Sequence, residues 1–191
     1  MAKRILLLAS GAGSLAEAVM DARIEGIEII ALISDREAPV LERAQERGIK
    51  NILISYKDAP SRDEWNKKII EITHSLAPDL VLSLGFMRIL PPEFVNTFPT
   101  INTHPALLPK YPGAHAVRDA LADGATLTGS TVHWVDEGMD TGEVIKQVSV
   151  EVLSSDTEES LHERIKIEER KLIVEVLSHY SQNKIKSGLM K

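Results

Sequence analysis

The chain has 191 residues, of which 43% are hydrophobic and 26% are charged, a composition typical of a globular domain that can bury a large core. Its 22 basic and 28 acidic residues give a net charge of −6, which argues against a general nucleic-acid-binding surface. It contains no cysteine, which excludes disulfides, thiolate catalysis and zinc–cysteine sites, and its apolar run 5–9 is too short to span a bilayer.

The first hundred residues alternate short apolar runs with helical patterns. The apolar runs show no polar alternation, as expected for parallel strands that are covered on both faces. Ser61 and Glu64 predict a capping box at the start of the third helix. The alternation predicts a doubly wound, mostly parallel, Rossmann-like α/β sheet. We expect strands at 4–9, 27–34, 51–54 and 80–84, and helices at 14–23, 40–47 and 62–76.

The second half has longer strand patterns and a different connection between them. The turn-rich segment 136–142 separates two of these patterns, which predicts a hairpin and therefore a mixed sheet. Residues 155–158 offer a second capping box, which would open a long C-terminal amphipathic helix. The strands are expected at 100–104, 125–135 and 143–152, and the apolar side of the helix at Leu161, Ile165, Leu172, Val176 and Tyr180.

A glycine-containing turn, Ser10-Gly11-Ala12-Gly13-Ser14, joins the first strand to the first helix. Glycines permit a tight turn and a close approach of the backbone, and free amides at a helix N-terminus attract a phosphate. The dinucleotide fingerprint also needs a third glycine, here Ala16, and an acidic residue about 20 positions later, for which Asp35 is roughly placed. The turn therefore favours phosphate binding, while a mononucleotide, a dinucleotide and a purely structural turn all stay open.

Asn102 and His104 are two residues apart in an expected strand, so their side chains share one face. Three prolines within 105–112 then stiffen the following loop. An amide donor beside a titratable imidazole suits a reaction that builds negative charge on a carbonyl oxygen. We therefore expect an enzyme with its active site here, and a cis peptide bond between Leu108 and Pro109.

Segments in this order and spacing, from about residue 4 to about residue 170, resemble the folate-dependent formyltransferases. Segments 85–90 and 102–113 are specific to that family, while the glycine turn and the chain length favour the glycinamide ribonucleotide transformylases within it. The matching segments are Gly-Ala-Gly-Ser at 11–14, Gly-Phe-Met-Arg-Ile-Leu at 85–90, Asn-Thr-His-Pro-Ala-Leu-Leu-Pro-Lys-Tyr-Pro-Gly at 102–113, Gly-Ser-Thr-Val-His at 129–133 and Asp-Thr-Gly at 140–142.

The resemblance implies transfer of the formyl group of 10-formyltetrahydrofolate to the amino group of N1-(5-phospho-D-ribosyl)glycinamide in purine (IMP) synthesis, with no metal. It implies a catalytic trio of Asn102, His104 and Asp140, supported by Thr131 and His133. The folate-binding residues that it implies are Arg62, Met87, Arg88, Ile89, Leu90, Asn102, Asp136, Glu137, Gly138, Met139 and Asp140. Those implied for the phosphate and the rest of the amine substrate are Gly13, Ser14, Leu15, Lys166 and Glu169.

Three positions depart from the family pattern. Leu15 stands where many members carry Asn, which removes a side-chain amide contact with the phosphate and leaves the backbone amides and Ser14. Lys166 replaces a frequent Gln and would add a positive charge, and Arg170 stands where His is common.

Arg88 follows a parallel strand, where it is well placed for a ligand carboxylate.

We expect one domain over 1–191, with a phosphate-binding half (1–100), a catalytic and folate-binding half (101–182) and a loose tail (183–191). The expected partners are small molecules, without nucleic acid or membrane, for a cytoplasmic monomer or homodimer. Alternatives are a formyltetrahydrofolate hydrolase, a formyltransferase acting on methionyl-tRNA or a sugar nucleotide, and a non-catalytic nucleotide- or NAD-binding protein. The first two normally carry a further domain, and the last would leave Asn102, His104 and Asp140 without a role.

Overall fold

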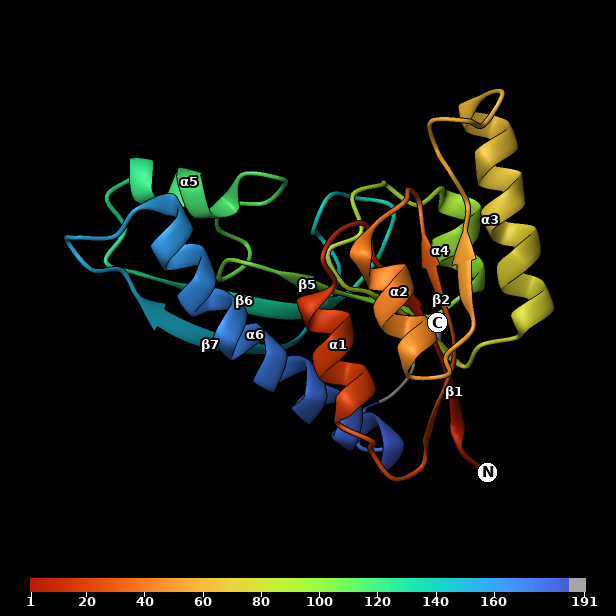
Figure 1. Ribbon diagram of the computed structural model, residues 1–191. Helices are drawn as coiled ribbons and strands as arrows, with labels where there is room; N and C mark the ends of the chain where they lie inside the picture. The colour runs from red at the N-terminus through yellow and green to blue at the C-terminus, as the bar shows by residue number, and fades with distance from the viewer. Residues whose placement is uncertain (186–191) are drawn as a thin grey trace.

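The computed structural model describes residues 1–185, which fold into one seven-stranded sheet with helices on both faces (Figure 1). The strand order is β3-β2-β1-β4-β5-β6-β7, with parallel pairing from β3 to β5 and antiparallel pairing from β5 to β7. This confirms the expected mixed sheet. The strands are β1 (Lys3–Leu8), β2 (Ile27–Ser34), β3 (Asn51–Leu53), β4 (Leu80–Ser83), β5 (Thr100–His104), β6 (Leu127–Trp134) and β7 (Val144–Glu151).

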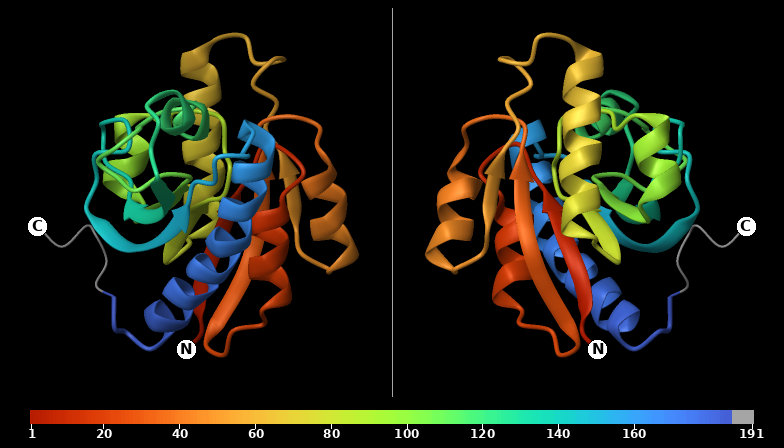
Figure 2. Two further views of the ribbon diagram at one scale, coloured as in Figure 1. Left: turned by 90° about the vertical axis from the view of Figure 1, so that its left-hand side faces the viewer. Right: turned by 90° about the vertical axis from the view of Figure 1, so that its right-hand side faces the viewer.

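The helices divide between the two faces of the sheet, so the central strands are buried on both sides (Figure 2). Leu7 of β1 packs toward α1, α2 and α6, while its neighbours Leu6 and Leu8 pack toward α3 and α4. Each fully buried leucine of this kind contributes about 1.5–3 kcal/mol, which explains why β1 is apolar from residue 5 to its end. The helices are α1 (Ser14–Asp21), α2 (Pro39–Glu46), α3 (Arg62–Leu76), α4 (Pro92–Thr97), α5 (Ala116–Ala122) and α6 (Glu158–Ser181).

The expected strands and the first three helices lie within two residues of those observed, but α4 and α5 are missing from the sequence prediction. Both helices are short, so neither provides a long periodic pattern, and α4 begins at the second of two consecutive prolines. None of the helices within residues 1–185 is long and apolar enough to cross a membrane.

The predicted helix caps are partly correct. Ser61 accepts a hydrogen bond from the Glu64 N–H at 3.1 Å, but the Glu64 carboxylate pairs with Lys67 rather than returning to Ser61. At α6 the capping box forms between Thr157 and Ser160, not within 155–158, because α6 begins at Glu158.

The apolar stripe of α6 is buried as expected, and it contains one charged residue. Glu169 lies on the same stripe between Ile165 and Leu172, with 3% of its surface exposed. Of the tail expected over 183–191, Ile185 packs against the core, and residues 186–191 lie outside the described part of the chain.

Candidate active site

The carboxyl end of β5 and the facing part of β6 bring four polar side chains onto one face of the sheet. Asn102 is paired with His133, and His104 with Thr131, across the antiparallel β5–β6 ladder. Directly paired residues project to the same side of a sheet, so the two histidines and the amide lie close together. The opposite face of the same strands carries Thr103, which is covered by α6.

Asp140 comes from the loop between β6 and β7 and lies between the two imidazoles. Its Oδ2 is 3.3 Å from His104 Nδ1, and its Oδ1 is 3.5 Å from His133 Nε2. The Gly113 N–H donates to Oδ2 at 2.8 Å. Asp140 has a φ of 55°, a left-handed conformation that costs energy for a residue with a side chain. The loop therefore holds this carboxylate against the histidines at the expense of backbone strain.

Asp140 is ionised because its hydrogen bonds outweigh its burial. Burial by itself would raise the pKa of Asp140, but the hydrogen bonds from His133 and the Gly113 N–H, with the positive charge of His104, hold that pKa below its ordinary value. The site therefore holds a negative charge between the two imidazoles.

The hydrogen-bond partners define which ring nitrogens carry hydrogen. His104 Nε2 lies 2.7 Å from the Tyr111 carbonyl oxygen, and His133 Nδ1 lies 2.8 Å from that of Trp134. A carbonyl can only accept, so both of these nitrogens are protonated. His133 Nε2 lies 3.3 Å from the Asn102 amide nitrogen and 3.5 Å from Asp140 Oδ1, so it donates to Asp140 when it carries a hydrogen and accepts from the amide when it does not. In either case at least one amide hydrogen of Asn102 is left for another acceptor.

The proline-containing loop is anchored by β6 and β7. The Thr131 hydroxyl donates to the Ala106 carbonyl at 2.6 Å and accepts from the Leu108 N–H at 3.1 Å. Gln147 donates from β7 to Thr131 at 2.9 Å and to the Leu108 carbonyl at 2.8 Å. The cis Leu108–Pro109 bond is confirmed. Gln147 is absent from the sequence prediction, since only strand pairing brings it to this loop.

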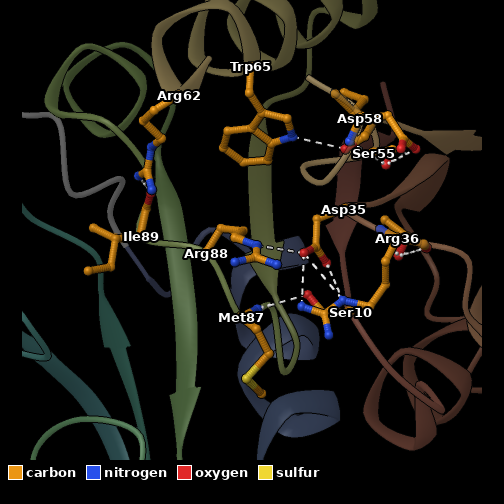
Figure 3. A network of polar contacts seen from close by, with 12 residues as sticks. Ser10, Asp35, Arg36, Ser55, Asp58, Arg62, Trp65, Met87, Arg88 and Ile89 are labelled. Carbon is orange, nitrogen blue, oxygen red and sulfur yellow. Dashed lines mark hydrogen bonds and ion pairs between the residues drawn. The ribbon is translucent and has the colours of Figure 1, made fainter. Parts of the chain in front are cut away.

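Segment 87–90 presents apolar side chains at the surface beside this site. Met87 is 64% exposed and Ile89 is 67% exposed, which is unusual for residues of this size. Met139 of the 136–142 loop is 59% exposed, and Leu90 is buried. Arg62 donates to the Ile89 carbonyl from the start of α3, so it joins the same surface (Figure 3). An apolar ligand face could pack here.

The Arg88 side chain does not point toward that apolar surface. Its Nε donates to Asp35 at 2.7 Å, and its guanidinium carbon lies 4.1 Å from the centre of the Tyr56 ring (Figure 3). From the sequence we expect this guanidinium to bind a ligand carboxylate, but in the structure it is already paired with Asp35. The backbone of 87–90 remains free to contribute.

The glycine turn and α6 form a second region. Gly13 has a φ of 79°, and a Cβ there would lie 2.2 Å from Val40 Cγ2, so only glycine fits. Ser14 begins α1, while the Leu15 side chain is buried in the core and can offer only its backbone N–H. This agrees with the expectation that only the backbone amide of position 15 is available to a phosphate.

Lys166 and Glu169 lie on α6, which packs against α1. Lys166 pairs with Glu163 at 2.7 Å. Burial raises the pKa of Glu169 to about 7, although the Thr103 and Ser130 hydroxyls and the nearby cations Lys166 and Arg170 oppose the increase.

Asp35 does not support the dinucleotide alternative. Its side chain is fully buried and engaged by Arg36 and Arg88, so it cannot accept hydrogen bonds from a ribose.

Within residues 1–185, no group of three or more His, Cys, Asp or Glu residues is arranged to hold a metal ion.

Known proteins match nearly the whole chain. Residues 3–177 match the family described as formyl transferase. The phosphoribosylglycinamide formyltransferase of Mycobacterium tuberculosis strain H37Rv is 49% identical over 175 residues, which cover 90% of this chain and 81% of that protein. The enzyme of the same name from Escherichia coli strain K12 is 36% identical, covering 95% of this chain and 89% of that protein.

Solved structures agree with these sequence matches. The crystal structure of glycinamide ribonucleotide transformylase 1 from Symbiobacterium toebii superposes with a TM-score of 0.92 at 35% identity, covering 98% of this chain and 92% of that chain. The phosphoribosylglycinamide formyltransferase of Streptococcus pneumoniae TIGR4 gives a TM-score of 0.86 at 36% identity, covering 93% of this chain and 98% of that chain.

Proposed function

The chain belongs to the formyl transferase family and, within it, to the phosphoribosylglycinamide formyltransferases, and we propose that Asn102, His104 and Asp140 carry its reaction. Enzymes of this family transfer a formyl group from 10-formyltetrahydrofolate to the amino group of glycinamide ribonucleotide in purine biosynthesis. The observation that supports the assignment most strongly is the position of the Asp140 carboxylate between the imidazoles of His104 and His133, beside the Asn102 amide.

Asn102 and His104 stabilise the developing oxyanion. The substrate amine attacks the formyl carbon, and the formyl oxygen becomes negatively charged in the tetrahedral intermediate. Asn102 offers the amide hydrogen that His133 does not use, and His104 offers a hydrogen from its charged ring. The 3.3 Å contact of His104 Nδ1 with Asp140 is longer than the 2.7 Å contact of Nε2 with Tyr111, so Nδ1 is the nitrogen that changes acceptor at lower cost.

Asp140 lies against His104 and assists proton transfer. When the bond between the formyl carbon and the folate nitrogen breaks, the leaving nitrogen gains a proton and the attacking amine loses one. The Asp140 carboxylate, which is ionised and still partly accessible, can hold a water that passes this proton. The step balances without an oxidant, a reductant or a covalent enzyme intermediate.

Substrate binding follows the two regions of the site. We assign the folate to Arg62, to the backbone and apolar side chains of 87–90, and to the 136–140 loop. We assign the phosphate to the amides of Gly13, Ser14 and Leu15, helped by Lys166 on α6 and by the buried carboxyl of Glu169 behind it. The packing of α1 against α6 supports this grouping.

The test is to mix the protein with 10-formyltetrahydrofolate, with and without glycinamide ribonucleotide, and to follow the absorbance of the deformylated folate. We expect a signal that requires the amine. A signal independent of the amine would instead indicate a hydrolase, and no signal under either condition would overturn the proposal.

Asp140→Asn should abolish most of this signal, because an amide cannot stabilise the charged imidazole. Asp21→Asn is the matched control, since Asp21 forms a surface pair with Arg47 at the far end of α1. Equal losses in the two variants would remove Asp140 from the mechanism.

A further inference from the structure

Asp35 is a buried carboxylate that the proposed reaction does not use. It follows β2, and its side chain has no exposed surface. Arg88 donates to it at 2.7 Å and Arg36 at 3.1 Å (Figure 3). Burial by itself would raise the pKa of Asp35, but Arg36, Ser10 and Arg88 together hold that pKa below its ordinary value. The carboxylate is therefore charged, and removing its partners would leave an uncompensated buried charge.

Ser10 connects this carboxylate to both regions of the active site. Its hydroxyl accepts from the Met87 N–H at 2.8 Å, and the same hydroxyl contributes to the lowered pKa of Asp35. Its own N–H donates to the Gly85 carbonyl at 3.3 Å. Since Ser10 opens the glycine turn, one hydroxyl links the start of that turn to the start of segment 87–90.

Arg88 forms the second link. Its guanidinium is held between the Asp35 carboxylate and the Tyr56 ring, while the Tyr56 N–H donates to the Asp35 carbonyl at 2.9 Å. Arg88 and Tyr56 therefore both bind Asp35, Arg88 through the carboxylate and Tyr56 through the backbone carbonyl. The carboxyl ends of β2, β1 and β4, which are adjacent in the sheet, are cross-linked by one buried network.

We propose that Asp35 is a positioning residue that holds the glycine turn and segment 87–90 at a fixed separation, so that the two substrates bind in register for transfer. The identity of those substrates rests on the proposed function. Small displacements of bound reactants reduce rates strongly, so a rigid connection between the two binding segments has direct value for catalysis. Asp35 itself touches neither substrate.

The consequence is that one substitution at Asp35 affects both substrates. Asp35→Asn keeps the shape of the side chain, but it removes the charge and replaces one acceptor oxygen with an NH2 donor, so Arg36, Arg88 and Ser10 can no longer all be satisfied. We expect the KM for the folate and the KM for the amine substrate each to rise about 5-fold or more, with a smaller change in kcat. A residue that serves stability alone would lower the unfolding temperature and leave both KM values unchanged.

Ser10→Ala provides the second variant, because it leaves the Asp35–Arg88 ion pair in place and should fold even where Asp35→Asn does not. It should raise both KM values, and the double variant should be no worse than Asp35→Asn alone, since both act through one network. Asp58→Asn is the matched control, because Asp58 pairs with Ser55 at 2.6 Å on the neighbouring loop, outside this network (Figure 3).

Hydrogen exchange at the Met87 amide tests the network without any enzymatic activity. We expect its exchange to become at least about 10-fold faster in both Asp35→Asn and Ser10→Ala, and to stay unchanged in Asp58→Asn. Unchanged exchange, or a rise in KM for one substrate only, would overturn the inference. An inactive wild-type protein would instead overturn the proposed function, and Met87 exchange would still decide whether Asp35 couples the two segments.

Discussion

The two hydrogens of the Asn102 side-chain amide have different surroundings. One amide hydrogen faces His133, and the other remains available for the oxygen of a ligand. His133, the neighbour that contacts this amide, is itself fixed by the Trp134 carbonyl and lies 3.5 Å from Asp140. At the scale of residues, this arrangement is what distinguishes the site from an ordinary polar strand end.

Replacing Asn102 with Ala should lower turnover by about 10²-fold or more, the usual cost of losing one oxyanion donor. The measurement is steady-state formyl transfer at saturating concentrations of both substrates. The control is the denaturant midpoint for unfolding of the variant, because a lower rate is informative only if the variant is folded. Near-normal turnover would show that Asn102 does not stabilise the oxyanion.

Packing of α6 on the sheet buries the carboxyl of Glu169 and raises its pKa. Its pKa is raised from an ordinary value of 4.5 to about 7 by burial, so between these pH values the folded protein keeps a proton that the unfolded chain has lost. Stability must therefore fall as pH rises through this window. At about 1.4 kcal/mol per pKa unit, the loss is on the order of 3 kcal/mol.

Glu169→Gln should remove most of this dependence, and the variant should be more stable than the wild type at pH 7.5 but not at pH 4.5. Urea unfolding at the two pH values provides the measurement. Glu168→Gln is the control, since Glu168 pairs with Lys171 at the surface. An unchanged pH slope in Glu169→Gln would mean that this carboxyl is ionised in the folded protein.

At the scale of elements, the glycine turn is set by its contact with α2. Gly13 and Gly124 both have left-handed backbone angles, at φ 79° and φ 66°, but only Gly13 meets another side chain within 4 Å. Gly124→Ala should therefore lower the free energy of unfolding by about 1–2 kcal/mol through backbone strain alone.

Gly13→Ala should cost more than Gly124→Ala, because Val40 must also move. Chemical unfolding of both variants measures the difference. Equal costs would show that the α1–α2 packing adjusts freely around a new methyl group.

At the scale of the whole molecule, both halves of the chain share one sheet, and β4 hydrogen-bonds to β5 directly across the division near residue 100. The two tryptophans lie in different parts of the core: Trp65 packs on the α3 face and Trp134 on the α6 face. They can report separately on the two layers.

We therefore expect one cooperative unfolding transition. In Trp65→Phe and Trp134→Phe, the fluorescence of the remaining tryptophan should change at the same denaturant concentration as the loss of helix and strand signal. Separate midpoints within one variant would indicate two independently unfolding units instead of the single domain that we predict.

Much of the fold was predictable because its strands are defined by local patterns. Continuous apolar runs, such as 5–8, indicate strands covered on both faces, and the turn-rich segment 136–142 indicates the hairpin. The two short helices α4 and α5 escaped prediction since neither completes a periodic pattern. The capping of α6 by Thr157 and Ser160 was missed because neighbouring polar residues offer several competing caps.

The sequence by itself determined the fold class and predicted the residues that we propose to perform the chemistry, because apolar strand runs and the motif at 102–113 are local properties of the chain. Only the tertiary structure decided that Asp140 reaches both histidines, that Arg88 is bound by Asp35 instead of facing a ligand, and that the Leu15 side chain is buried. The physical reason is that these contacts join residues far apart in the chain, and their geometry depends on strand order, loop conformation and packing rather than on local sequence.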